Sequence, residues 1–535
     1  MDLIISLVAL AVPVLLLTAG LTPSAWADRH VPFMRGLASV VTLVSFICAL
    51  AAAVMLVGTG AVDVRYAAVP GAPVLNFGVY FDSLAATMLL LITCIGIFIV
   101  RFSMRYLDGD GHQGQFLRWI LFTLGSVLLL VVSRNLLQFT LAWIVTDFGL
   151  HQLLTHHAHR PWALWTARKR SLIAGLGDVL LVVALVASYM TFGSLDYTVV
   201  FEAAVAMQGT SLGKTALVGM IASLFVIAAM TKSAQFPFHS WLPDTMEAPT
   251  PVSALMHAGI INAGGFLVIR LSPMVVLSDA ALGFLAINGA LTALLGGVVM
   301  FTQTSVKRSL AFSTIAQMGF MMLQCGLGSF SAALLHIVAH SLYKAHAFLS
   351  SGSILTLAAR MPPSQSRSFS WKASLGMSFL STILAVAILS ASLFLFGLRL
   401  DEKPGGWVLG LVLAMALSRL MSTAMETGYL RLSILGIGAA AGVAVLYLSL
   451  FEVMDTLLKE TVSHQPVADS PFDITVSAVA MASFFLMFIL THFTQGFSHF
   501  WWMHRFYVHA NNGFYLDIPL RRITARIYGQ RAAVS

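Results

Sequence analysis

The chain has 535 residues, of which 58% are apolar and only 10% are charged, and its formal net charge is +8. Because soluble globular proteins are about 25% charged, this composition excludes a soluble enzyme and a disordered or collagen-like chain, and it indicates a membrane protein. Surplus Lys and Arg in such a chain reflect membrane topology, so we expect no nucleic-acid partner.

The first apolar run extends from Leu3 to Leu21 and lacks a basic segment before it. We interpret it as a first transmembrane helix rather than a cleaved signal. Further apolar runs follow along the chain, each near the roughly 20 residues that cross a bilayer, and they predict an all-α, polytopic bundle of about 13–15 helices. The predicted spans begin near Leu3, Gly36, Tyr80, Phe116, Asn135, Ser171, Lys214, Thr250, Ala280, Lys307, Ser331, Ala373, Gly406, Arg431 and Phe472.

Basic residues fall in every second connection between the predicted spans, as expected of loops that stay in the cytoplasm. Between the fifth and sixth spans we assign Arg160, Arg168, Lys169 and Arg170 to one such loop. The intervening connections are acidic or neutral. This pattern predicts a multi-pass protein with a periplasmic N terminus and a cytoplasmic C terminus.

The most informative residues are ionisable ones within apolar segments, because a charge at membrane depth is costly and marks a functional site unless it reaches the interface. Lys232 ends the run Leu217 to Met230, and Pro237 then breaks the helix. The break frees backbone groups that need a polar cavity, which favours a transport site. A lysine whose ammonium reaches the interface is equally compatible with this position.

A histidine lies inside the next apolar helix. Thr250 suits the N-cap and Pro251 the first turn, which places His257 about two turns into the span. Neutral imidazole takes up and releases protons near neutrality, so His257 suits a relay. A hydrogen-bonded structural histidine is the alternative.

Three titratable residues, His336, His340 and Lys344, are spaced i, i+4 and i+8 within the apolar segment Ala332 to Leu357. This spacing places them along one stripe of a helix, as a proton relay requires. Two histidines four residues apart can also bind zinc, but no carboxylate accompanies them on that face.

Three more charged residues extend the set: Asp147 and Asp178 lie inside apolar spans, and Lys307 opens the tenth. We predict a proton pathway bridged by water and hydroxyl groups. Its predicted members are Lys232, His257, Lys307, His336, His340 and Lys344, with Asp147 and Asp178 as further candidates.

Four histidines, His151, His156, His157 and His159, follow the fifth span with no acidic neighbour in sequence beyond Asp147. We interpret them as part of a solvated cytoplasmic loop, with ion binding as the alternative.

The segment from Lys232 to Ala258, with its Lys-Ser-Ala-Gln-Phe-Pro, Trp-Leu-Pro-Asp and Glu-Ala-Pro-Thr-Pro motifs, closely resembles the antiporter-like subunits of respiratory complex I and of Mrp cation/proton antiporters. The likeness continues through Lys307 to Thr314 and His336 to Ala345. It implies that Lys232 is the lysine of the broken helix, His257 the eighth-helix histidine and the 336–344 stripe the eleventh-helix relay. It also implies four regions: N-terminal helices (1–115), a proton-translocation core (116–360), divergent C-terminal helices (361–500) and a basic cytoplasmic tail that contacts a partner (501–535).

The chain departs from that family at three places. Ile144 stands where the family has a glutamate, and Gly175 where it has an arginine, so a charge pair is expected to be lost, with Asp147 one helical turn further on as its nearby substitute. The twelfth span, Ser374 to Leu400, has no charged residue in its centre.

The shorter form of the chain and the stretches Gly149 to Leu154 and Asn512 to Asp517 resemble the DabB family, the membrane subunits of bacterial inorganic-carbon-accumulating complexes. The resemblance implies an inner-membrane subunit that conducts H⁺ or Na⁺ and drives a DabA-like partner on the cytoplasmic side, which holds the zinc and converts CO2 to bicarbonate. It implies no cofactor or metal in this chain. The alternatives are a subunit of a redox-driven pump or Mrp-type antiporter, and a passive membrane anchor for the partner.

Overall fold

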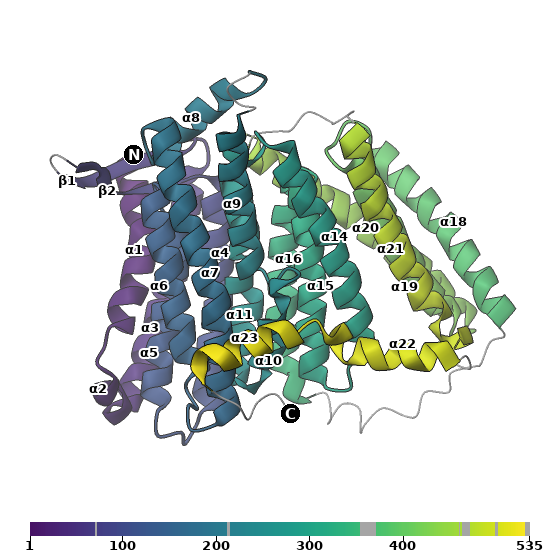
Figure 1. The fold of residues 1–535 in the computed structure, drawn as a ribbon, viewed down its shortest axis with the longest axis horizontal. Coiled ribbons are helices and arrows are strands. Elements are labelled where there is room, and N and C mark those ends of the chain that lie inside the picture. The colour runs from purple at the N-terminus through teal and green to yellow at the C-terminus, as the bar shows by residue number, and fades with distance from the viewer. Residues whose placement is uncertain are drawn as a thin grey trace.

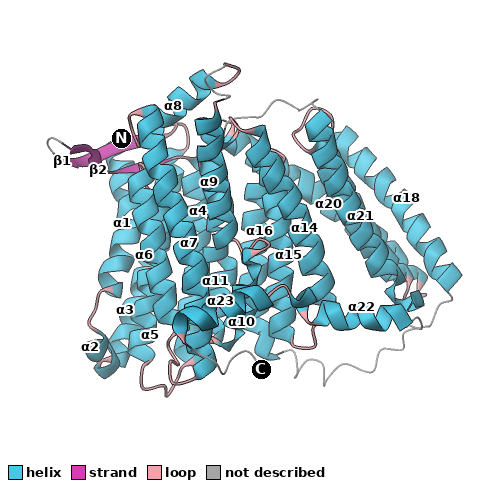
Figure 2. Cartoon of the chain, viewed as in Figure 1, coloured by secondary structure: helices cyan, strands magenta, loops and turns pink. Residues whose placement is uncertain are grey.

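The computed structural model describes residues 1–69, 72–210, 215–353, 371–459, 461–462, 471–497 and 501–529. Long helices stand side by side in a wide bundle (Figure 1), and helix dominates except for one pair of short strands (Figure 2). Within the described residues, eleven helices are long and apolar enough to cross a membrane. The predicted all-α transmembrane bundle is confirmed, apart from the hairpin.

The first part of the bundle contains seven long helices and two short ones. They are α1 (Asp2–Gly20), α2 (Ser24–Arg29), α3 (Val31–Leu56), α4 (Ser83–Tyr106), α5 (Gln113–Val131), α6 (Leu136–Leu154), α7 (Pro161–Phe192), α8 (Tyr197–Met207) and α9 (Ala216–Lys232). Because lipid offers no hydrogen-bonding partners, apolar runs of this length satisfy their backbone groups internally by forming helices. Asp82 and Asn135 cap two of them by accepting bonds from the amides of Ala85 and Gln138.

Two helices are broken inside the bundle. After Lys232 the chain leaves α9 and forms η1 (Phe238–Ser240), α10 (Trp241–Asp244) and η2 (Thr245–Glu247). The next span consists of α11 (Thr250–Ala258), η3 (Ile260–Asn262) and α12 (Ala263–Arg270), followed by the single turn α13 (Ser272–Val275). The predicted helix break after Lys232 is therefore confirmed, and a second break follows His257.

The remaining spans are α14 (Asp279–Thr302), α15 (Val306–Gly326), α16 (Phe330–Ser350), α18 (Trp371–Phe396), α19 (Gly406–Met425), α20 (Leu430–Leu458) and α21 (Pro471–Phe497), and the turn η4 (Ser351–Ser353) follows α16. Helices α18, α19 and α20 share a small apolar core of their own. The tail forms α22 (Trp501–Asn511), η5 (Gly513–Tyr515) and α23 (Ile518–Tyr528), which run across the ends of the other helices (Figure 1, yellow).

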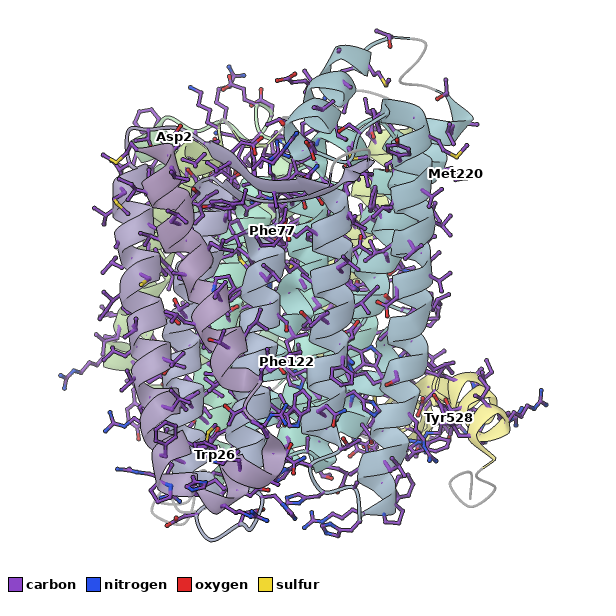
Figure 3. All side chains as sticks on the ribbon, turned by 90° about the vertical axis from the view of Figure 1, so that its left-hand side faces the viewer. Asp2, Trp26, Phe77, Phe122, Met220 and Tyr528 are labelled. Atoms are coloured by element: carbon purple, nitrogen blue, oxygen red, sulfur yellow. The ribbon has the colours of Figure 1, made fainter. Side chains whose placement is uncertain are left out.

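The bundle has two opposite faces. Asp2 and Met220 lie near one end of the helices, and Trp26 and Tyr528 near the other (Figure 3). We call the end near Asp2 the N-terminal face and the end near Tyr528 the C-terminal face (Figure 3). The tail helices α22 and α23 lie on the C-terminal face.

A hairpin covers part of the N-terminal face. Strands β1 (Val62–Val69) and β2 (Ala72–Phe81) pair antiparallel, with Val62 opposite Phe81. Arg134 forms ion pairs with Asp63 and Asp196, at 2.5 and 2.6 Å, and so fastens the hairpin to the connections beside it. The sequence analysis predicted no strand here, because apolar residues next to a span fit an extension of that helix as well as they fit a strand.

Helix α7 begins ten residues earlier than the sequence analysis expected. Arg168, Lys169 and Arg170 were assigned to a cytoplasmic loop, and that assignment is wrong: all three lie within α7, and Lys169 and Arg170 are buried. Close packing holds this helix in place, since a Cβ atom at Gly177 would collide with Thr231 Oγ1 on α9. Helix α7 therefore carries basic residues into the interior beside Lys232.

Candidate functional site

The first group of buried charges lies where α6, α7 and α9 meet. Asp147 on α6 accepts a bond from the ammonium of Lys232, with Nζ and Oδ1 2.5 Å apart, and another from the guanidinium of Arg170. The Lys232 ammonium also lies 4.4 Å from the centre of the Trp143 ring, a cation–π contact. We call Asp147, Arg170, Lys232 and Asp178 the acid–base cluster.

Asp178 completes this cluster without a direct bond to it. It lies on α7, partly buried, and one of its carboxylate oxygens is buried with no hydrogen-bond partner among the described residues. Its charge interacts with those of Asp147, Lys232 and Arg170. The cluster thus contains two acids and two bases, so its formal charges cancel when all four are ionised.

This geometry corrects the expectation that the family's charge pair is lost. Asp147 lies three residues after Ile144 on α6, and Arg170 lies five residues before Gly175 on α7. The two helices run in opposite directions, so both shifts move the charge toward the C-terminal face, by about 4.5 and 7.5 Å along the helix axes. The acid and the base of the pair are therefore both present at shifted positions, and they still form an ion pair. Sequence reasoning missed Arg170 because it lies in a basic run that is typical of a loop.

The second group follows α16 and contains bases only. His257, His340 and Lys344 are buried, and His336 is partly buried with its Nε2 atom inside the protein. The rings of His336 and His340 stack with centroids 5.8 Å apart. Lys344 donates to the carbonyl of Leu310 and to Ser313 Oγ. We call these four residues the histidine stripe.

His257 joins the stripe from α11, which packs against α16. Its ring stacks on Phe348 with centroids 4.4 Å apart, and its Nδ1 lies 3.0 Å from Thr314 Oγ1. Its Nε2 is buried with no hydrogen-bond partner among the described residues, and the same holds for both ring nitrogens of His340. No ion pair with a carboxylate is found for any of the four bases, all of which lie in the described part of the chain. The stripe is therefore a set of bases without an acidic counter-charge among the described residues.

The two helix breaks connect the two groups. Ser233, next to Lys232, donates to the carbonyl of Ile261 at 2.6 Å. The following residue, Asn262, donates its side-chain amide to Ser341 Oγ at 2.8 Å, and Ser341 neighbours His340 on α16. Polar atoms of both breaks thus lead from the acid–base cluster to the histidine stripe.

Polar residues lie at both ends of the stripe. Toward the N-terminal face, Ser331 on α16 donates to Asp455 Oδ1 on α20, and Lys403 donates to the other oxygen of this carboxylate, both at 2.7 Å. Toward the C-terminal face, Lys307 lies in the first turn of α15, partly exposed and with no hydrogen bond or ion pair to the other predicted pathway residues. Sequence analysis did not single out Asp455, because it stands near an acidic loop.

The tail is fastened beside the acid–base cluster. Lys169 on α7 donates to Asp244 of α10 at 2.8 Å, to the carbonyl of Ser240 at 2.9 Å, and to Asp517 at the start of α23. Burial alone would raise the pKa of Asp517, but the charges of Lys169 and Arg521 hold it below its usual value. The tail is therefore bound to Lys169, the residue that precedes Arg170 in the chain.

The loop histidines are not all solvated. The side chain of His156 is only 5% exposed and its Nε2 lies 3.5 Å from Asp110 Oδ2. The interpretation of this segment as a solvated loop without an acidic neighbour is wrong for His156, because the acid comes from the connection between α4 and α5. Among the described residues, Asp110, His156 and His157 form the group with the spacing of metal ligands.

Comparison with known proteins agrees with this architecture. Residues 133–430 match the family described as NADH:quinone oxidoreductase/Mrp antiporter, transmembrane, and residues 70–117 match the N-terminal family of complex I chain 5. The Mrp complex from Dietzia sp. superimposes with a TM-score of 0.65 at 22% identity, covering 98% of this chain and 60% of that chain. At this identity the likeness shows the fold alone.

Three related sequences define the family more narrowly. A probable inorganic carbon transporter subunit, DabB2 of Halothiobacillus neapolitanus, is 37% identical over 461 residues, which cover 86% of this chain and 82% of that protein. DabB of Hydrogenovibrio crunogenus is 41% identical over 51% of this chain and 52% of its own length. Chloroplastic NAD(P)H-quinone oxidoreductase subunit 5 of Nandina domestica is 38% identical over 52% of this chain and 38% of its own length. The chain therefore belongs to the DabB family of inorganic carbon transporter subunits, within the antiporter-like membrane subunits of complex I and Mrp complexes.

Proposed function

We propose that this subunit conducts protons through the membrane along the acid–base cluster and the histidine stripe, and that the proton flux drives conversion of CO2 to bicarbonate by a DabA-like zinc partner. In this proposal the C-terminal face is cytoplasmic and carries the partner, the N-terminal face is periplasmic, and the membrane is the bacterial inner membrane. The pathway includes Lys232, His257, Lys307, His336, His340 and Lys344, with Asp147 and Asp178, as the sequence predicts.

One observation carries the proposal. Buried polar atoms with no hydrogen-bond partner among the described residues lie along the route: Asp147 Oδ2, Asp178 Oδ1, Gln235 Oε1, Ser253 Oγ, His257 Nε2, Asn262 Oδ1, His336 Nε2 and both ring nitrogens of His340. Buried polar groups are nearly always hydrogen-bonded, to protein or to ordered water. A run of such atoms among bundled helices therefore supports a hydrated passage, and titratable groups along such a passage can relay protons.

The chemistry of the stripe favours protons over Na⁺. Hard cations prefer oxygen ligands such as carboxylates and carbonyls, whereas His257, His340 and Lys344 offer nitrogen bases that bind protons. An imidazole beside another imidazole can accept a proton on one nitrogen and release one from the other. The driving force is large enough, since each charge that crosses 100 mV is worth about 2.3 kcal/mol.

The decisive experiment uses the subunit together with its partner in proteoliposomes, with a membrane potential and a pH-sensitive dye in the lumen. Lys232→Ala and His340→Ala should each reduce proton flux by about 100-fold, the scale of positioned proton transfer. His346→Ala is the matched control, since His346 lies exposed on the same helix and should leave the flux unchanged. The same variants should fail to rescue a strain that requires high CO2.

Each alternative has its own outcome. A passive anchor would tolerate both variants, with growth rescued at air levels of CO2 and the complex assembled. An Mrp-type antiporter would show proton movement only when a Na⁺ gradient is supplied, and the family likeness to Mrp complexes makes this the second candidate function. Proton flux without Na⁺ that disappears in Lys232→Ala and His340→Ala would separate the proposed function from both.

A further inference from the structure

Two connections on the C-terminal face meet outside the proposed proton pathway. One joins α4 to α5 and carries Asp110, and the other joins α6 to α7 and carries His156 and His157. Their potential ligand atoms, one oxygen and two ring nitrogens, all lie within 4.8 Å of one another. Asp110 lies 46 positions before His156 in the chain, so no short sequence motif contains this group.

The geometry of His156 is not explained by ordinary hydrogen bonding. Its Nε2 is buried and forms no hydrogen bond in the described part of the chain, and its distance to Asp110 Oδ2, 3.5 Å, is beyond the usual N–H···O range. Phe116 holds the ring edge-on at 4.9 Å. A nitrogen and an oxygen that each bind one tetrahedral zinc ion at about 2.0–2.1 Å lie about 3.4 Å from each other, so this separation suits two ligands of a shared metal.

The charges around this position suit a cation. Asp110 provides a carboxylate oxygen, and His156 and His157 provide ring nitrogens, as the potential ligand atoms. Asp110 Oδ1 accepts a hydrogen bond from the backbone amide of His112 at 2.8 Å, which orients the carboxylate, and Asp110 Oδ2 is the oxygen that lies 3.5 Å from His156 Nε2. Neutral imidazoles and an ionised carboxylate are the forms in which these groups bind metals.

We propose that Asp110, His156 and His157 form a binding site for a divalent transition metal of the zinc class. Two imidazoles and one carboxylate are a known three-ligand zinc set, with water in the fourth position, and their mixed nitrogen and oxygen donors disfavour Mg²⁺ and Ca²⁺. The bound metal ties the α4–α5 connection to the start of α7, close in sequence to Lys169 and Arg170. The inference concerns this chain alone and does not rest on the proposed proton conduction.

The experiment uses the full-length subunit, purified with and without its partner, stripped with chelator and then loaded with Zn²⁺ or Co²⁺. Wild type should bind one more zinc per subunit than His156→Gln or His157→Gln, measured by elemental analysis after gel filtration. Comparing variants within the same complex cancels any zinc that the partner holds. His159→Gln is the matched control, because His159 lies in the same loop, meets the ring of His157 edge-on and is outside the ligand group.

Two further measurements keep the test decisive if a variant folds poorly. Co²⁺ added to wild type should give the visible absorption of a four-coordinate site, and Asp110→Asn, which keeps the shape of the side chain, should weaken Co²⁺ binding by at least about tenfold. Zn²⁺ should also raise the melting temperature of wild type and not that of His156→Gln. Equal zinc content in wild type, His156→Gln and His159→Gln, or no Co²⁺ spectrum in wild type, would overturn the proposal.

Discussion

The acid–base cluster and the histidine stripe both bury ionisable side chains, but only the cluster provides them with opposite charges. In the cluster, the Asp147 carboxylate lies between the cations Lys232 and Arg170, with Asp178 nearby, so each charge has a counter-charge. In the stripe, His257, His336, His340 and Lys344 have hydroxyl, carbonyl and aromatic neighbours and form no ion pair with a carboxylate among the described residues. Paired charges hold one another in place. Unpaired buried bases are most stable when neutral, so each carries a bound proton only for a short time. In the proposed proton pathway, the cluster is therefore the part with fixed charges, and the stripe is the part that takes up and passes on protons.

The largest expected effect comes from removing the central acid of the cluster. Asp147→Asn leaves Lys232 and Arg170 buried side by side, and breaking a buried ion pair typically costs about 3–5 kcal/mol. We expect a strongly lowered melting temperature in detergent and no proton flux. In the double variant Asp147→Asn/Lys232→Met, the charge balance returns, so stability should recover while the flux stays absent. Equal stability of wild type and the single variant would contradict the paired-charge description.

The stripe should respond differently, with loss of function but little loss of stability. Lys344→Arg keeps a cation near Ser313 and Leu310, but a guanidinium does not release its proton in proteins. We expect flux to fall by about 100-fold with an unchanged melting temperature. Lys344→Met, which removes the charge, should also keep the fold, because no carboxylate is left unpaired. If Lys344→Met unfolds the protein as Asp147→Asn does, the contrast between the two regions is wrong.

The N-terminal end of the stripe should give an intermediate effect. Asp455→Asn removes the acid that accepts a hydrogen bond from Ser331, five residues before His336 on α16. Because water and the Ser331 hydroxyl remain, we expect flux to fall by about tenfold rather than to vanish. Glu452→Gln, one turn earlier on α20, serves as the control and should have a smaller effect. A flux in Asp455→Asn equal to that of wild type would place the opening of the route elsewhere.

The docking of the tail should be insensitive to pH near neutrality. A carboxylate whose pKa is lowered in the folded state stabilises that state above its unfolded pKa, and the stabilisation is lost only as the pH falls through the lowered value. For Asp517 this loss lies below about pH 4, the unperturbed value. Hydrogen exchange of residues 518–528, corrected for intrinsic rates, should therefore match at about pH 5 and about pH 8. Asp517→Asn should raise exchange at both values, and a pH-dependent release in wild type would contradict this ion pair.

Lys307 should give the smallest effect. It is partly exposed on the first turn of α15, and no bond ties it to the stripe. An exposed charge at the mouth of a route raises the local ion concentration only weakly at physiological salt, so Lys307→Ala should change flux by about twofold or less. A loss as large as that of Lys344→Arg would instead make Lys307 an obligatory step of the pathway.

Much of the stripe could be predicted from the sequence, and much of the cluster could not. His336, His340 and Lys344 share a helix, so their spacing alone places them on one face. Lys232 was found because it is an ionisable residue at the end of an apolar run that a proline then breaks, and His257 because it is an ionisable residue inside an apolar span. Arg170 was missed because a basic run at a helix start has the same composition as a cytoplasmic loop. His156 was misread for a related reason, since its acidic neighbour comes from a different connection.

By itself, the sequence determined that this chain crosses the membrane many times, that a helix breaks after Lys232 and which bases lie along α16. These properties depend on hydrophobicity and on periodicity within single segments, which local chemistry fixes. Only the tertiary structure decided that Asp147 is held by Arg170 and Lys232, that the stripe has no counter-charge, and that Lys169 binds Asp244 and Asp517 of the tail. Such partners come from different helices, and the packing of those helices sets which side chains meet.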